Sequence, residues 1–244
     1  MQPSEFDNDH LGERGSLYGV TFEKEGIHTM SLCIGFVDHE DGVLAADGRM
    51  LRKGSVRSES VLKTMRLNDS LAIAFVGRIG EIRQVQGALI PGYEWKDSTQ
   101  FCQAWEDSGR VLNIGFKTAR DRVKKVVQSI RRRPSEHDDP GIGVLLMGKA
   151  RGRPVLWGWD NAEGSKPTED TWGFMSIGAR PEDGSDELER YGRIIAASQT
   201  AKGAERRLAE AIRYCASDLG HHAVNGNVST RRLSKRNALV WDCS

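Results

Sequence analysis

The sequence lacks any apolar run that approaches the roughly 20 residues needed to cross a membrane as a helix. Its first thirty residues also lack the basic-then-apolar order of a secretion signal. Neither sign of charge dominates, because 35 basic and 34 acidic residues leave a formal net charge of +1. A chain so balanced has no overall field to recruit nucleic acid or an anionic membrane. We therefore expect a cytoplasmic protein with neither nucleic-acid nor membrane partners.

Cysteine and histidine are scarce, and neither is spaced as metal ligands usually are. The four cysteines are scattered and form no CxxC motif. Among the six histidines the only pair is His221–His222, and adjacent side chains point to different faces of a helix or a strand. Unpatterned thiols suit a reducing compartment. We expect no metal and no cofactor.

Strand and helix patterns alternate along the rest of the chain. Residues 31–37 and 42–47, then 61–67 and 71–77, are two hairpin patterns and predict a four-stranded antiparallel meander. Blocks of helices and antiparallel strands are typical of an α+β domain, and the length allows one large core over 31–244. Helices are expected at 80–90, 97–108, 116–133, 186–198 and 202–220, and further strands at 142–150, 153–160, 171–178 and 237–242, the last paired with residues 224–230.

Four residues lie on the first four predicted strands, one on each. Each has an ordinary explanation when taken alone: a first strand residue, a turn carboxylate, an outward-facing lysine and a turn glycine. Their nearly equal spacing, by 16, 16 and 14 residues, makes the set more informative than its members. They are Ser31, Asp47, Lys63 and Gly77.

This set resembles the proteasome β-subunits and HslV, which are N-terminal nucleophile (Ntn) hydrolases. The stretch GVLAADGR matches the family's apolar-Ala-Ala-Asp-x-Arg pattern, while VLKTMRL supplies its lysine and AFVGRIGE its turn glycine. The later stretch MGKARGRPVLWGWDNAEG resembles the family's Gly-Arg-Pro hairpin. The resemblance is dense over residues 30–90 and implies a four-layer αββα sandwich, in which helices cover both outer faces of two antiparallel sheets.

The resemblance also implies a role for each residue. An N-terminal hydroxyl attacks the substrate, and the α-amine of the same residue, with an ordinary pKa near 8, accepts its proton. The Lys63 ammonium favours the free-base form of that amine, and Asp47 offsets the cost of burying Lys63. The Gly77 N–H would stabilise the oxyanion. Arg49 would brace the region around Asp47.

Two residues compete for the role of nucleophile. Thr29 is the residue type that the family uses, but aligning it requires two extra residues in the turn between the first two strands. Ser31 needs no insertion, and it places Gly35 where the family commonly has Ala or Gly. The stretch MSLC also resembles the Met-Thr-Tyr-Cys start of the bacterial Anbu-type relatives. We therefore favour Ser31 and keep Thr29 as the alternative.

Residues 1–30 are expected to be a leader, a propeptide or an untranslated segment read through. Lys24-Glu25-Gly26 can be encoded as AAG-GAG-GGN, which contains a bacterial ribosome-binding sequence just upstream of Met30. If Met30 is the start codon, removal of the initiator exposes Ser31. The alternative is an autocatalytically cleaved propeptide. The family usually has Gly before that cut, whereas His28 and Met30 stand there.

The resemblance departs from the family pattern late in the chain. The family has a Ser after a Gly in its later strand, and here Gly178 is followed by Ala179. It also has an Asp followed by a Ser near the end of its last helix. Asp218 would be that acidic residue, but His221 stands where the Ser is expected. These departures bear on activity more than on fold.

The expected function is that of a peptidase subunit acting on protein or peptide substrates. The family's pocket positions would place the substrate side chains near Met50, Met65 and Phe75, which suggests that apolar substrate residues are accepted. The resemblance implies a homo-oligomeric ring or an open helical assembly, and it makes an ATPase unfoldase a candidate partner. Two alternatives stay open. One is an Ntn amidohydrolase that cuts a small amide, and the other is a ring subunit that lacks the nucleophile, as α-type proteasome subunits do.

Overall fold

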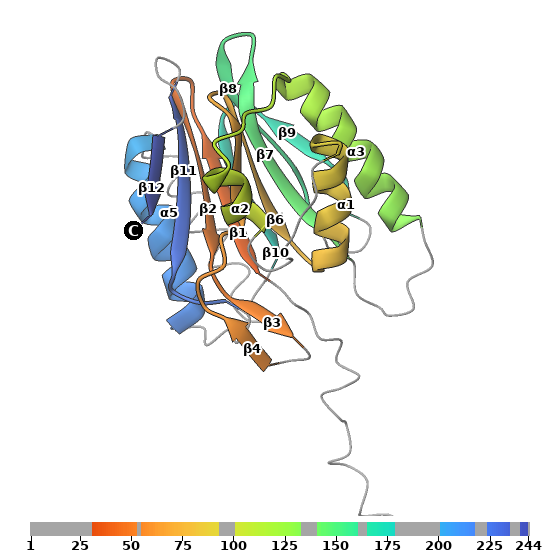
Figure 1. Ribbon diagram of the computed structural model, residues 1–244. Coiled ribbons are helices and arrows are strands. Elements are labelled where there is room, and N and C mark those ends of the chain that lie inside the picture. Colours follow the sequence, from red (N-terminus) through yellow and green to blue (C-terminus); the bar gives the residue numbers. More distant parts are fainter. Residues whose placement is uncertain are drawn as a thin grey trace, which may run out of the picture.

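The computed structural model describes residues 31–52, 55–92, 101–132, 141–160, 165–178, 201–217, 224–234 and 240–243. These residues form the expected mixed α+β fold (Figure 1). Several predictions concern residues outside the described ones. They are the leader with Thr29, the helix at 186–198, and the three late positions Ala179, Asp218 and His221.

Most predicted elements are present, with small shifts at their ends. The helices are α1 (Ile79–Leu89), α2 (Phe101–Asp107), α3 (Phe116–Arg131) and α5 (Ala201–Ser217). None of the helices in the described residues is long and apolar enough to cross a membrane. The strands are β1 (Leu32–Val37), β2 (Asp41–Asp47), β3 (Met50–Arg52), β4 (Ser55–Ser58), β5 (Thr64–Asn68), β6 (Leu71–Val76), β7 (Gly143–Ala150), β8 (Arg153–Trp159), β9 (Thr168–Asp170), β10 (Gly173–Gly178), β11 (Val228–Ser234) and β12 (Val240–Cys243).

The predicted four-stranded meander is wrong. The strands form two five-stranded antiparallel sheets, with orders β10-β1-β2-β11-β12 and β5-β6-β7-β8-β9, so the two N-terminal hairpins belong to different sheets. A separate short hairpin, β3–β4, lies between them in the chain and projects from one end of the sheets (Figure 1). The sequence did not reveal this hairpin because β4 is short, polar and largely exposed. The predicted pairing of β11 with β12 is confirmed.

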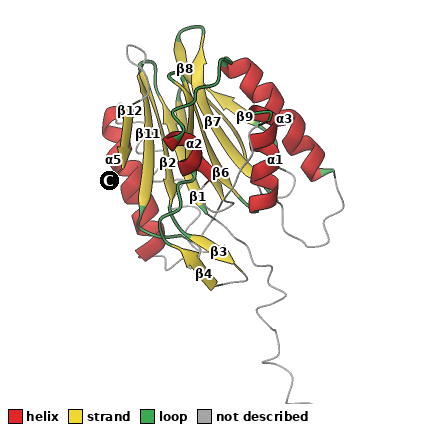
Figure 2. Ribbon diagram, viewed as in Figure 1, coloured by secondary structure: helices red, strands yellow, loops and turns green. Residues whose placement is uncertain are grey.

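Three clusters of buried apolar side chains show how the described elements pack. Alternate strand residues face opposite sides of a sheet, and both sides of β1 are buried. Leu32, Ile34 and Phe36 pack in the cluster that joins the first sheet to α5. Cys33 and Val37 pack in the cluster between the two sheets. The third cluster joins the second sheet to α1, α2 and α3, on the side away from α5 (Figure 2).

Gly35 lies at a close approach of the two sheets. A Cβ added to it would lie 2.7 Å from Cδ2 of Leu156 on β8, too close for two carbon atoms. The small residue at this position is therefore explained by packing between the sheets. It does not by itself indicate a neighbouring active site.

Candidate active site

The two N-terminal hairpins bring the four predicted residues to one region. Ser31 immediately precedes β1 and Asp47 ends β2, which pair antiparallel with Cys33 opposite Ala46. Lys63 immediately precedes β5 and Gly77 follows β6, which pair with Thr64 opposite Ala74. The two sheets pack face to face through the cluster that contains Cys33 and Val37. The open ends of the β1–β2 and β5–β6 hairpins therefore meet.

Asp47 and Lys63 form a buried ion pair. The Lys63 Nζ donates to Oδ1 and to Oδ2 of Asp47, both at 2.9 Å. The side chains of Lys63 and Asp47 are 9% and 0% exposed. The backbone N–H of Leu32 donates to Oδ1 and that of Arg49 to Oδ2, each at 2.9 Å. Each carboxylate oxygen thus accepts two hydrogen bonds, the condition under which a buried charge pair is tolerated.

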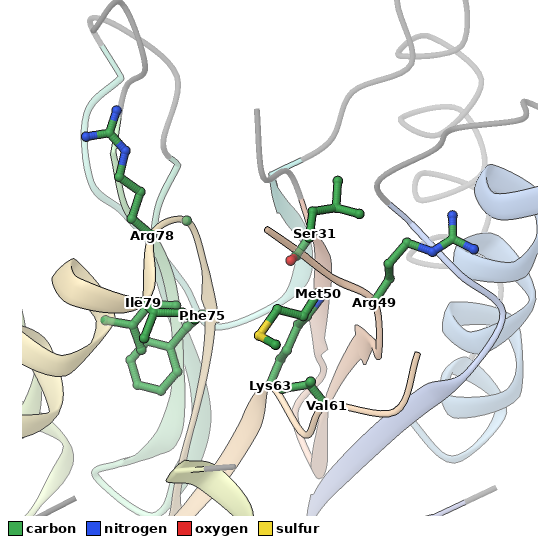
Figure 3. A pocket seen from close by; sticks show the side chains of 11 residues that line it. Ser31, Arg49, Met50, Val61, Lys63, Phe75, Arg78 and Ile79 are labelled. Carbon is green, nitrogen blue, oxygen red and sulfur yellow. The ribbon is translucent and has the colours of Figure 1, made fainter. Parts of the chain in front are cut away.

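Ser31 and Lys63 line the same pocket, which has a volume of about 240 Å³. Ser31 is partly exposed, and the Lys63 side chain extends toward it (Figure 3). Phe75 and Ile79 lie on the opposite wall. A partly exposed serine and a buried lysine therefore line one pocket.

The apolar lining of this pocket differs in one residue from the prediction. Met50 and Phe75 line it, as expected. Met65 does not, because its side chain is fully buried in the cluster between the second sheet and the helices. Val61 and Ile79 provide apolar wall instead.

Gly77 lines the pocket, and its backbone explains why it is a glycine. Its φ is +116°, in a region that residues with a Cβ rarely adopt. A Cβ there would lie 2.2 Å from the carbonyl oxygen of Gly141. The sequence interpretation attributed this glycine to close approach of substrate. Contact with Gly141 is a second and sufficient reason for it.

A polar network that the sequence did not reveal holds the turn after Asp47. Asn225 is 5% exposed; its side-chain oxygen accepts the Gly48 N–H at 2.9 Å, and its amide nitrogen donates to Glu59. Arg49 completes the network through its Nε, 3.1 Å from Oε2 of Glu59. Nothing local in the sequence indicated it, because Gly48 and Asn225 are 177 residues apart.

Glu59 should stabilise this network in a pH-dependent way. The hydrogen bond from Arg49 lowers the pKa of Glu59, and Asn225 adds to the effect. A carboxyl whose pKa is lower in the folded state contributes stability above its unfolded pKa, about 4.3, and loses it as the pH falls through the folded value. Because Glu59 is half-exposed, the contribution should stay below about 1 kcal/mol.

We therefore expect Glu59→Gln to lower the free energy of unfolding at pH 7 and to have little effect near pH 3. Urea titrations of the wild type and the variant at pH 7, 5 and 3 measure the difference. A difference that is equally large at pH 3 would contradict this assignment.

The start of β1 also contacts β10 tightly. Gly178, opposite Leu32 in the register, has φ +98°. A Cβ on it would lie 1.9 Å from the Ser31 carbonyl oxygen. Its N–H donates to Oδ1 of Asp160 at 3.3 Å. Only a residue without a Cβ therefore fits beside the Ser31 carbonyl on the side of β1 opposite β2.

Two buried thiols near the ion pair are poor nucleophiles. Burial raises the pKa of the Cys33 thiol well above its ordinary value, although Lys63 opposes this, and the thiol donates to the Phe75 carbonyl at 3.4 Å. Burial, with the Asp47 charge, raises the pKa of Cys215 to about 11. Among the described residues, no group of three or more His, Cys, Asp or Glu side chains is placed to hold a metal ion.

Comparison with known proteins found relatives of one kind. No family model matches the sequence. The chain is 29% identical over 175 residues to proteasome subunit alpha 1 of Haloferax volcanii, covering 72% of this chain. It is 24% identical over 169 residues to proteasome subunit alpha 2 of Haloarcula marismortui, covering 69% of this chain. The aligned part spans 63% of the length of each of these curated relatives.

These similarities bear on the predicted family in two ways. The relatives are proteasome subunits, and this supports a place for the chain in the proteasome and Ntn hydrolase superfamily. They are α-type subunits, so they do not support the finer resemblance to β-subunits or HslV. The comparisons thus show a similarity to α-type proteasome subunits and do not test whether this chain is catalytic.

Proposed function

We propose that this chain is a proteasome-like peptidase subunit that hydrolyses peptide bonds through Ser31 once Ser31 is the first residue. In this proposal residues 31–244 form one domain with the four-layer αββα arrangement of Ntn hydrolases. The observation that carries the proposal is the buried pair of Lys63 and Asp47, with Nζ–O distances of 2.9 Å, in the pocket that Ser31 lines. A buried lysine beside an N-terminal residue favours a neutral amine.

The reaction would proceed by acyl transfer. The Ser31 Oγ bonds to the substrate carbonyl carbon while the Ser31 α-amine accepts the hydroxyl proton. The peptide C–N bond then breaks, the leaving nitrogen takes that proton, and water hydrolyses the ester. Lys63 keeps the α-amine neutral, and Asp47 holds Lys63 in place. Gly77 would donate its backbone N–H to the oxyanion, and Arg49 fixes Asp47 through its own N–H.

Labelling by a β-lactone or vinyl-sulfone probe tests this assignment. We expect covalent labelling of the wild type, its loss in Ser31→Ala and its retention in Thr29→Ala. The reverse pattern would move the nucleophile to Thr29. Matched peptide and small-amide substrates then separate a peptidase from a small-amide hydrolase, because both would label alike.

A second candidate function is that of a non-catalytic ring subunit. It is favoured by the α-type names of the relatives. A wild-type protein with a confirmed Ser31 terminus that the probe never labels would support it. Asp218, outside the described residues, would belong to the site only in the peptidase proposal.

Both candidates share an assembly and a location. In both proposals the chain would form a homo-oligomeric ring or an open helical assembly in the cytoplasm. An ATPase unfoldase would be a partner of the peptidase rather than of a bare scaffold. Sedimentation of the purified protein would show whether it assembles at all.

A further inference from the structure

A second pocket adjoins the pocket that contains Ser31. It has a volume of about 380 Å³ and shares two wall residues, Met50 and Val61, with the first pocket. The rest of its wall is mostly polar, contributed by the β3–β4 hairpin, the segment that follows it, and α2. These polar residues are Arg57, Ser58, Ser60 and Gln103.

The charge around the two pockets has one sign. Arg49, Lys63 and Arg78 line the first pocket and Arg57 lines the second, while no acidic side chain of the described residues lines either. Lys63 is neutralised by Asp47, and Arg49 is paired with Glu59. Arg57 differs, because it has no hydrogen-bond or ion-pair partner among the described residues. Arg57 is exposed and lines the second pocket.

We propose that this second pocket binds a carboxylate of the peptide substrate through Arg57. The guanidinium presents two parallel N–H groups that match the geometry of a carboxylate, and the hydroxyls of Ser58 and Ser60 are further donors. This carboxylate site rests on the proposed function, because that function supplies the peptide. It adds the substrate class, namely peptides with an acidic group near the scissile bond.

Because the two pockets share a wall, the carboxylate would lie two residues before or after the side chain that enters the first pocket. Alternate side chains of an extended peptide point to the same side, about 6.6–6.8 Å apart. A peptide whose apolar side chain enters the first pocket therefore directs the side chain two residues away past Met50 and Val61. An aspartate or glutamate at that position reaches Arg57.

Binding measurements without turnover test the proposal. The protein is the Ser31→Ala variant that begins at residue 31, and the probes are fluorescent, C-terminally amidated peptides with one leucine. Each peptide has Glu, Gln or Lys two residues before or after that leucine. A further peptide ends two residues after the leucine with a free carboxylate, which distinguishes a terminal carboxylate from a side-chain one.

We expect Glu to bind about fivefold to tenfold more tightly than Gln at one of the two positions. Arg57→Gln should remove the difference, and Arg57→Glu should create a preference for Lys. Lys117→Gln is the matched control, since Lys117 is exposed on α3 and lines neither pocket, and it should keep the preference for Glu. Urea unfolding midpoints check that each variant is folded.

Equal affinities for Glu and Gln, or a preference that survives Arg57→Gln, would overturn the proposal. Covalent labelling of Ser31 is read separately. A protein that labels but shows no carboxylate preference keeps the proposed function and loses this inference. A preference set by Arg57 in a protein that never labels keeps the carboxylate site and removes the peptidase.

Discussion

Replacing Asp47 with alanine should lower the free energy of unfolding by about 3–5 kcal/mol, the usual cost of leaving one member of a buried ion pair unpaired. The loss arises because Lys63 stays buried with its charge uncompensated, and because the N–H groups of Leu32 and Arg49 lose their acceptor. Urea denaturation at pH 7 measures it.

The matched control is Glu210→Gln. Glu210 pairs with Arg206 on α5 at 3.3 Å, with side-chain exposures of 45% and 78%, so its loss should cost less than about 0.5 kcal/mol. The double variant Asp47→Asn/Lys63→Met should cost less than the sum of its single variants, because it leaves no unpaired charge. Equal losses in Asp47→Ala and Glu210→Gln would contradict the buried pair.

Gly77→Ala should lower the free energy of unfolding by more than about 2 kcal/mol, since a strained φ and an overpacked contact each cost about 1–3 kcal/mol. The new Cβ would meet the Gly141 carbonyl oxygen at 2.2 Å, and φ is +116°. Thermal or urea unfolding would show the change. Loss of activity in this variant would therefore not isolate an oxyanion role.

Gly87→Ala provides the contrast for this prediction. Gly87 is an exposed residue inside α1, and a Cβ there meets nothing within 4 Å. Alanine at such a position should raise the free energy of unfolding by about 0.5–1 kcal/mol. If Gly77→Ala is tolerated as well as Gly87→Ala, the backbone explanation for Gly77 is wrong.

The elements that the sequence predicted well are those with a strong apolar pattern. Strands β1 and β6 are buried throughout, and α3 has a clear apolar face, so each stands out locally. Strands β3 and β9 have three residues each, which is too short for a periodicity to show. The pairing of the first two hairpins was mispredicted because proximity in the chain does not decide which sheet a hairpin joins.

The candidate site was predictable only where its residues recur at regular spacing on successive strands. The resemblance carried by the four spaced residues implied a pair of Asp47 and Lys63, which the structure places at 2.9 Å. Asn225 could not be found in this way, because its contact with Gly48 exists only after the chain has folded. Met65 was misassigned because a pocket position of the family was carried over to it, whereas its side chain is buried against the helices.

The most direct test of the central claim compares two forms of the chain by intact mass after exposure to the β-lactone probe. One form begins at Ser31 with a free α-amine, and the other is the same chain acetylated at that amine. We expect one probe adduct per chain in the free form, mapped to Ser31, and none in the acetylated form. A free form confirmed to begin at Ser31 that gains no adduct would contradict the proposal that Ser31 is the nucleophile.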